Sequence, residues 1–188
     1  MGCVITKGRG YFCGGQVGGI KKAYLLSFYD DDVITAVTTD GDGAVTGVTT
    51  ASGTPATFFE FDLDRQASSF NQTIVTGNGG AVAYQSDLDL KMSHDSEESW
   101  LRMQNVVEGL WQILIEDNNG VFYLLGVKNG VQVVGGTYAH GGDVAYGDYV
   151  GYEIQMQGAE PVPAYNMGTN PSGLTNITFS ATQYDHSS

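Results

Sequence analysis

The chain has 188 residues, enough for one domain with a sizeable core, and its 41% hydrophobic and 11% aromatic content excludes an intrinsically disordered protein. Twenty-one acidic residues against eight basic ones give a formal net charge of −13, so the chain as a whole should repel a nucleic-acid backbone. The 27 glycines show no three-residue period, and no apolar stretch approaches the roughly 18 residues that span a bilayer.

The N-terminal segment, residues 1–19, is rich in glycine and basic. The first 22 residues carry four bases and no acid, whereas residues 23–188 carry 21 acids and four bases, so the two parts have net charges of +4 and −17. A basic end beside an acidic body favours head-to-tail contacts between copies. Cys3 and Cys13 are too few for a disulfide framework and too far apart for a CxxC motif, so we expect free thiols. We expect no signal peptide and no lipid anchor.

Residues 20–92 are expected to form strand after strand. Apolar alternation and turn residues predict strands at about 20–29, 33–38, 44–50, 57–66, 70–76 and 81–92. The second and third of these flank DGDG at positions 40–43, which is a strong hairpin signal.

A single helix is predicted where the period changes from 2 to 3.6, at about residues 96–108. A sequence resembling a capping box precedes it, and a glycine follows it. Four residues at helical spacing are expected to pack it onto a sheet: Trp100, Met103, Val107 and Leu110.

Further strands are predicted at about 110–116, 121–127, 131–139 and 149–157, the first two joined by a hairpin turn at residues 117–120. The remaining residues hold three of the four prolines and few apolar anchors. The chain is therefore expected to consist of the N-terminal segment, a β domain over residues 20–160, and an extended C-terminal arm over residues 161–188.

Strict alternation of acidic and apolar residues marks two of the predicted strands. In residues 59–65 and 87–92 the apolar side chains point one way and the charged ones the other. If both strands lie in one sheet, five carboxylates share a face: Glu60, Asp62, Asp64, Asp87 and Asp89. We expect them to form an acidic wall past which an anionic polymer can slide. The alternative is an ordinary solvent-exposed face whose acids prevent aggregation.

No catalytic or cofactor motif is present. The three histidines, His94, His140 and His186, form no HxxxH pattern, and no G-x-S-x-G, P-loop or Rossmann pattern occurs. The DGDG turn lacks the later ligands of a calcium loop. A pair of acids could serve a glycosidase, but any acidic β domain offers many such pairs. We therefore expect neither an enzyme nor a cofactor or metal.

Two segments resemble a known family. FCGGQVGGIKKAYLLSF at residues 12–28 is similar to the start of virion structural proteins of phages that infect Bacteroidetes bacteria. So is a late GDxxGYEIxMQGxEP pattern, here Gly147, Asp148 and residues 151–161. Together with the order of strands and one helix, residues 12–161 resemble the tail-tube proteins of tailed bacteriophages.

The resemblance implies a two-sheet antiparallel β-sandwich or rolled barrel with one flanking helix. It also implies that six copies form a ring around a channel, that rings stack into the tail tube, and that viral DNA is ejected through it without specific binding. The expected partners are other copies and other tail proteins, and the expected location is the virion tail after synthesis in the host cytoplasm. Alternatives are a tail terminator or connector of the same fold, or a monomeric carbohydrate- or surface-binding β-sandwich.

Overall fold

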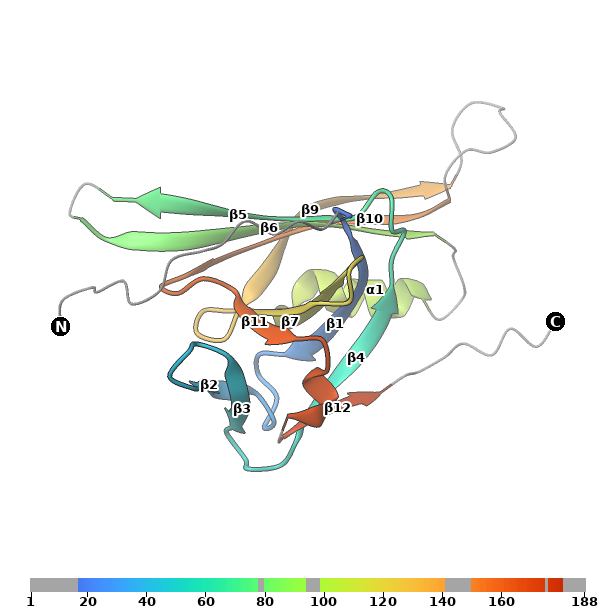
Figure 1. Cartoon of the computed structure of the whole chain (residues 1–188). Coiled ribbons are helices and arrows are strands. Elements are labelled where there is room, and N and C mark those ends of the chain that lie inside the picture. Colours follow the sequence, from blue (N-terminus) through green and yellow to red (C-terminus); the bar gives the residue numbers. More distant parts are fainter. Residues whose placement is uncertain (1–16, 78–79, 94–98, 141–149, 175, 181–188) are drawn as a thin grey trace.

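The computed structural model describes residues 17–77, 80–93, 99–140, 150–174 and 176–180. In these ranges the chain is mainly β, with a large mixed sheet, a small second sheet and one short helix in a sandwich-like arrangement (Figure 1), which confirms the predicted fold class. The elements are β1 (Ile20–Ser27), β2 (Ile34–Thr39), β3 (Val45–Thr50), β4 (Ala56–Asp62), β5 (Ser69–Thr76), β6 (Val82–Ser93), α1 (Ser99–Glu108), β7 (Leu110–Asp117), β8 (Phe122–Leu125), β9 (Val131–His140), β10 (Val150–Glu160), β11 (Tyr165–Gly168), the 3₁₀ turn η1 (Pro171–Gly173) and β12 (Ile177–Ser180).

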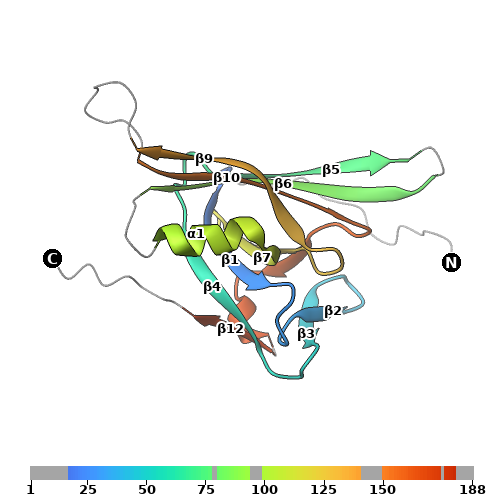
Figure 2. The ribbon, with the colours of Figure 1, turned by 180° about the vertical axis from the view of Figure 1, so that it is seen from behind.

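The large sheet folds over itself at β9. Its strand order is β12-β4-β1-β7-β9-β10-β6-β5, and β8 and β11 extend from β7. The start of β9 pairs with β7, whereas the rest of β9 pairs with β10, so this strand passes from one layer to the other. We call β12, β4, β1 and β7 the central layer, and β9, β10, β6 and β5 the outer layer (Figure 2).

One hydrophobic core fills the space between these two layers. Leu88 and Leu90 of β6 and Ile154 and Met156 of β10 contribute their alternate side chains from the outer layer. Strands β1 and β7 supply the opposing surface, with Ile113 fully buried. Period-2 sequences therefore form this core as expected, because every second residue of a strand points to the same face.

A second core covers the other side of the central layer. Phe58, Leu114 and Leu124 are fully buried there, beneath the β2–β3 hairpin and the C-terminal strands. The side chain of Gln112 joins the hairpin to β7: it accepts a hydrogen bond from the Ile34 amide at 2.8 Å and donates one to the Ile34 carbonyl at 2.7 Å. Because both polar ends of this buried amide are satisfied, it fixes the hairpin without a net penalty for burial.

The helix is confirmed, but part of its expected core face is wrong. Met103 packs in the first core, and its partner there is Val106, while Val107 is 52% exposed. Leu110 lies beyond the helix, half-buried at the start of β7. Met103 and Val106 are three residues apart and therefore share one helix face. The helix ends at Glu108, and the indole nitrogen of Trp111 donates to the Val106 carbonyl at 2.8 Å, which attaches the end of the helix to β7. The side chain of Trp100 lies outside the described residues.

The expectation of an extended C-terminal arm is wrong for residues 161–180. Strand β12 pairs in parallel with β4, and β11 pairs with β8. Met167 and Ile177 are buried in the second core, and the ring of Phe179 lies 4.9 Å from that of Tyr24. These few apolar residues do not form a core by themselves, but they complete one that β1 and β7 already supply.

Candidate functional site

The acids of β6 lie on the face of the outer layer that points away from the core. Leu88 and Leu90 are almost fully buried, so the alternation places Asp87 and Asp89 on the opposite face, where both are partly exposed. This part of the sequence prediction, an acidic face on a two-faced strand, is confirmed.

The flanking strands continue this face with polar side chains. The register of β10 on β6 places Gln155 opposite Asp89 and Gln157 opposite Asp87, and it places Glu153 opposite Lys91. On the other side, Ser69 and Asn71 of β5 lie opposite the same two aspartates. We call the side chains of Asp87, Asp89, Lys91, Glu153, Gln155 and Gln157 the polar face. Its three carboxylates and one lysine give a formal net charge of −2 per copy.

Side-chain amides orient the carboxylate of Asp87. Gln157 Nε2 donates to Asp87 Oδ1 at 2.7 Å, and Gln85 Nε2 donates to Oδ1 and Oδ2 at 3.2 and 3.3 Å. Ser69 makes a longer contact of 3.4 Å to Asp89. Amide donors hold a carboxylate in place without neutralising it, so the face keeps its negative charge.

Sequence reasoning missed Glu153, Gln155 and Gln157, although a signal was present. Residues 153–157 read E-I-Q-M-Q, the same period-2 alternation that marks β6. The alternation predicted the strand, but the polar face was predicted only from residues 59–65 and 87–92. Register then brings these residues beside Asp87 and Asp89.

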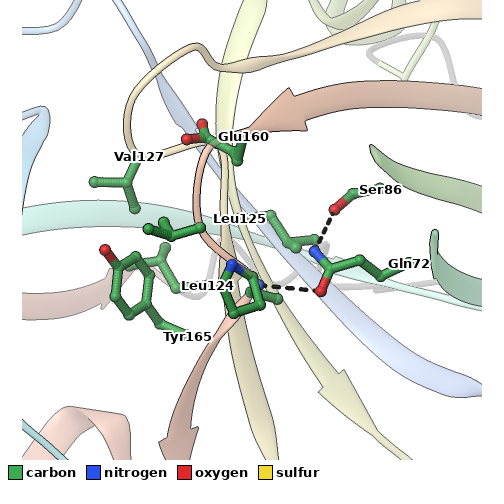
Figure 3. Close-up of a pocket in the computed structure, with 11 residues that line it drawn as sticks. Gln72, Ser86, Leu124, Leu125, Val127, Glu160 and Tyr165 are labelled. Atoms are coloured by element: carbon green, nitrogen blue, oxygen red, sulfur yellow. Dashed lines mark hydrogen bonds between the residues drawn. The ribbon is translucent and has the colours of Figure 1, made fainter. Parts of the chain in front are cut away.

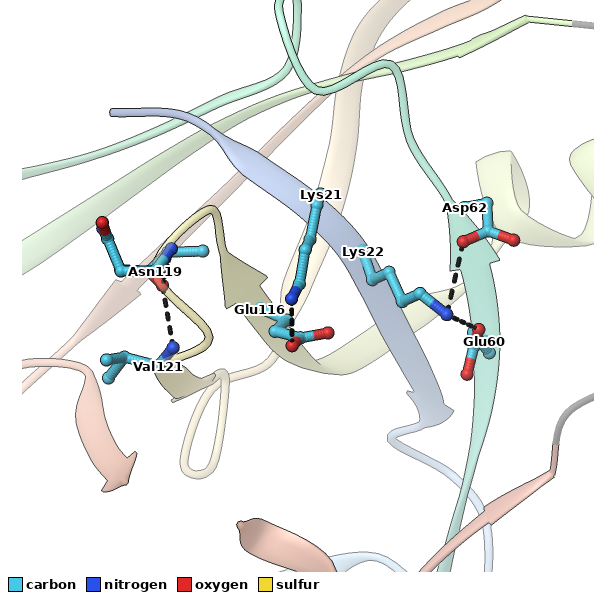
Figure 4. A network of polar contacts seen from close by, with 8 residues as sticks. Lys21, Lys22, Glu60, Asp62, Glu116, Asn119 and Val121 are labelled. Atoms are coloured by element: carbon cyan, nitrogen blue, oxygen red, sulfur yellow. Dashed lines mark hydrogen bonds and ion pairs between the residues drawn. The ribbon is translucent and has the colours of Figure 1, made fainter. Parts of the chain in front are cut away.

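Glu60 and Asp62 lie on a different surface, so the expectation that five acids share one face is wrong. Strands β4 and β6 do not pair, because β1, β7, β9 and β10 lie between them in the sheet. Glu60 and Asp62 point to the side of the central layer that holds the second core, and both form ion pairs with Lys22 of β1, at 3.4 Å for Asp62 (Figure 4). Asp64 follows the end of β4, and its carboxylate accepts the Gln66 amide in the next turn.

The charges around Lys22 form a compact network. Lys21 pairs with Glu116 of β7 at 2.6 Å (Figure 4), so two lysines meet three carboxylates. Burial lowers the pKa of Lys22, but its hydrogen bond to Glu60 and the charges of Asp62 and Glu60 outweigh this effect and raise it. Burial raises the pKa of the nearby Tyr24 hydroxyl, and the charges of Glu60, Glu116 and Asp62 raise it further. This network links β1 to β4 and to β7.

Both edges of the outer layer are open. Strand β5 ends the strand order, and the described residues place no strand beside its outer edge. Strand β9 pairs with β7 only at Val131 and Gln132, and within the described residues its outer edge from 134 to 137 has no strand partner. Open edges of this length in a sheet favour pairing with another chain.

The two hairpins of the outer layer extend beyond the central layer at opposite ends (Figure 1). Exposed apolar side chains occur on both: Ile74 is 63% exposed and Val82 48% exposed on the β5–β6 hairpin, and Val134 is 53% exposed on β9. Apolar side chains beside open strand edges are the kind of surface that protein–protein interfaces bury.

A small cavity lies beside Glu160, at the end of β10 (Figure 3). Glu160 is 7% exposed, and its Oε1 accepts the amides of Lys128 and Asn129 at 2.9 and 2.8 Å, while Oε2 has no hydrogen-bond partner among the described residues. The cavity of about 10 Å³ is no larger than one water molecule requires. Glu160 therefore fixes the turn into β9 and forms no site for a larger ligand.

The described residues contain no group of three or more His, Cys, Asp or Glu side chains placed to hold a metal ion. No helix in the described ranges is both long and apolar enough to cross a membrane. His94, His186, Cys3, Cys13 and the side chain of His140 lie outside the described residues.

Comparison of the chain with protein-family models, with curated proteins and with solved structures gave no match. The polar face and the two open edges therefore carry the functional interpretation by themselves.

Proposed function

We propose that this chain is a structural virion protein that assembles into rings, and that stacked rings form a phage tail tube through which DNA passes. The outer layers of neighbouring copies would join edge to edge, with the polar face lining the channel. The observation that carries the proposal is that one polar-faced sheet has two open edges whose directions are compatible.

The strand directions of the two open edges follow from the antiparallel pairing within the outer layer. Each neighbouring pair in the outer layer is antiparallel, from β9 to β10, from β10 to β6 and from β6 to β5. Strand β5 therefore runs opposite to β9, and β5 of one copy can pair in the antiparallel sense with β9 of the next. An interface between two different edges is heterologous, and such interfaces close into rings or grow into filaments.

The positions of the open edges are also compatible with a closed barrel. Gly135, Gln155, Asp89 and Ser69 lie on one row across the sheet. Beyond Gly135, β9 runs to one side of this row as far as His140, and beyond Ser69, β5 runs to the other side. Joining these two parts shifts each copy by about five residues, roughly 16 Å. Across four strands, about 19 Å wide, this shift corresponds to a strand tilt of about 40°, within the usual range for barrels.

The size and the charge of the resulting channel suit the passage of DNA. Six copies, the number that the resemblance implies, would supply 6 × 4 = 24 strands, and their backbone would enclose a barrel about 50 Å across. The polar face would give this channel a negative lining, which repels phosphates within a Debye length of about 8 Å. Its role would be to keep DNA from adhering.

Electron microscopy of the purified protein tests this proposal, with Asp87→Lys/Asp89→Lys as the key variant. We expect the natural protein to form rings or tubes that do not retain DNA, and the variant to form the same assemblies but bind DNA in a salt-sensitive way. Asp30→Lys/Asp31→Lys is the matched control, because it adds the same charge in the exposed β1–β2 loop. A strictly monomeric protein would contradict the proposal and favour a monomeric binding module.

A further inference from the structure

An open groove of about 640 Å³ lies at the start of β5. Its walls are residues 17–19, the loop 65–69 that leads from β4 into β5, and Asn118 of the β7–β8 turn. We infer that this groove receives the β9–β10 connection, residues 141–149, of an adjacent copy. The inference rests on the proposed edge-to-edge ring and assigns a second contact to it.

Hydrogen bonds hold the walls of the groove in place. Asn118 Nδ2 donates to the Gly18 carbonyl at 2.6 Å, and the Ile20 amide donates to the Ser68 carbonyl at 3.3 Å. Gly19 has a φ of +96°, and a β-carbon there would lie 2.9 Å from the Arg65 carbonyl, so the close approach of the two walls requires glycine. A groove formed in advance loses little entropy when a partner binds.

The proposed antiparallel pairing places the β9–β10 connection of the adjacent copy beside this groove. In an antiparallel pair the end of β9 lies beside the start of β5. Ser69 is both the first residue of β5 and a wall of the groove, so the groove continues the same interface. The chain that follows β9 in the adjacent copy therefore leaves the strand pair beside residues 65–68.

The charges are complementary. Residues 141–149 contain Asp143 and Asp148 and no cation, while Arg65 is exposed and is the one ionisable side chain among the residues that line the groove. The rival occupant, residues 1–16 of the same or another copy, contains Lys7 and Arg9 and no acid. Arg65 attracts the first segment and repels the second.

Zero-length cross-linking identifies the occupant. In assembled Arg65→Lys protein, a carbodiimide can couple the lysine amine at position 65 to a carboxylate in contact with it. Assembling a mixture of isotope-labelled and unlabelled chains then distinguishes cross-links between copies from cross-links within one copy. We expect mixed-label cross-links from position 65 to Asp143 or Asp148. Natural protein is the control, because a guanidinium does not couple.

Charge reversal provides the second measurement. Arg65→Glu should lower the fraction of protein that sediments as rings by at least about tenfold, since like charges then meet in the interface. Adding Asp143→Lys/Asp148→Lys in the same chain should restore rings. Lys128→Glu is the control of equal charge change at an exposed position outside the groove.

Failure of this inference and failure of the proposed function give different results. Three results would overturn the groove contact while leaving the ring proposal standing. Rings could form with cross-links from position 65 only within one copy, with cross-links only to Asp185, or with no cross-link to a carboxylate. Rings that form equally well from Arg65→Glu would do the same. A natural protein that forms no ring at all would overturn both.

Discussion

Strands β4 and β6 carry nearly the same local sequence, yet they use it in opposite ways. Both alternate acids with apolar residues, F-E-F-D in β4 and D-L-D-L in β6. In β4, the Glu60 side chain is only 20% exposed and is paired with Lys22. In β6, Asp87 is bound by neutral glutamine amides and lies on a face with a net negative charge.

The difference comes from the neighbouring strands. Strand β4 lies beside β1, whose two lysines bind the acids of β4 and β7. Strand β6 lies between β5 and β10, which present serine, asparagine and glutamine. Alternation fixes that a strand has an acidic side, but the adjacent strands decide whether those acids stabilise the fold or remain available for function.

Removing the charge of Lys22, which pairs with the acids of β4, should have the largest effect on stability. Lys22→Met leaves Glu60 and Asp62 without their partner, and we expect the free energy of unfolding in a denaturant titration to fall by about 1–2 kcal/mol. Lys22→Arg is the control that keeps the charge, and Lys22→Met/Glu60→Gln should recover part of the loss. An unchanged stability of Lys22→Met would show that the network contributes nothing to the fold.

Alkaline pH should weaken the same network by a smaller amount. The pKa values of Tyr24 and Lys22 are raised in the folded state, so above about pH 10 the folded chain holds protons that the unfolded chain has released. Stability should therefore be constant up to about pH 9 and then fall, at most by about 1.4 kcal/mol per pH unit for the Tyr24 proton. Tyr24→Phe should reduce this slope, as followed by thermal melts between pH 8 and 11. A slope that Tyr24→Phe leaves unchanged would assign the loss to other groups.

Neutralising the polar face should have the smallest effect on stability. Asp87→Asn and Asp89→Asn remove charges from a partly exposed face, so we expect each to change the unfolding free energy by less than about 0.5 kcal/mol. Asparagine keeps the size of the side chain, which makes it the matched replacement. A loss above about 1 kcal/mol for either variant would mean that these acids serve the fold in the same way as Glu60.

Local sequence patterns were sufficient to predict most of the strands and the helix. Period-2 alternation located the strands within a few residues, and the DGDG turn joins β2 to β3, with Asp40 Oδ1 accepting the amides of Asp42 and Ala44 at 2.9 Å. The change to a period of 3.6 located the helix. These features depend on interactions between residues close in sequence, and for that reason they can be read from a single chain.

The tertiary structure alone decided which strands are neighbours, and with that the candidate site. Nothing in the sequence of β4 or β6 states that four strands separate them, that β12 pairs with β4 from 121 positions away, or that Val106 rather than Val107 faces the core. Such pairings depend on the combined fit of distant segments, because hydrogen bonds between strands are the same for any sequence and only side-chain packing selects the partner. The sequence by itself determined that this protein has acidic two-faced strands, and the fold decided that only those of the outer layer form a polar face between two open edges.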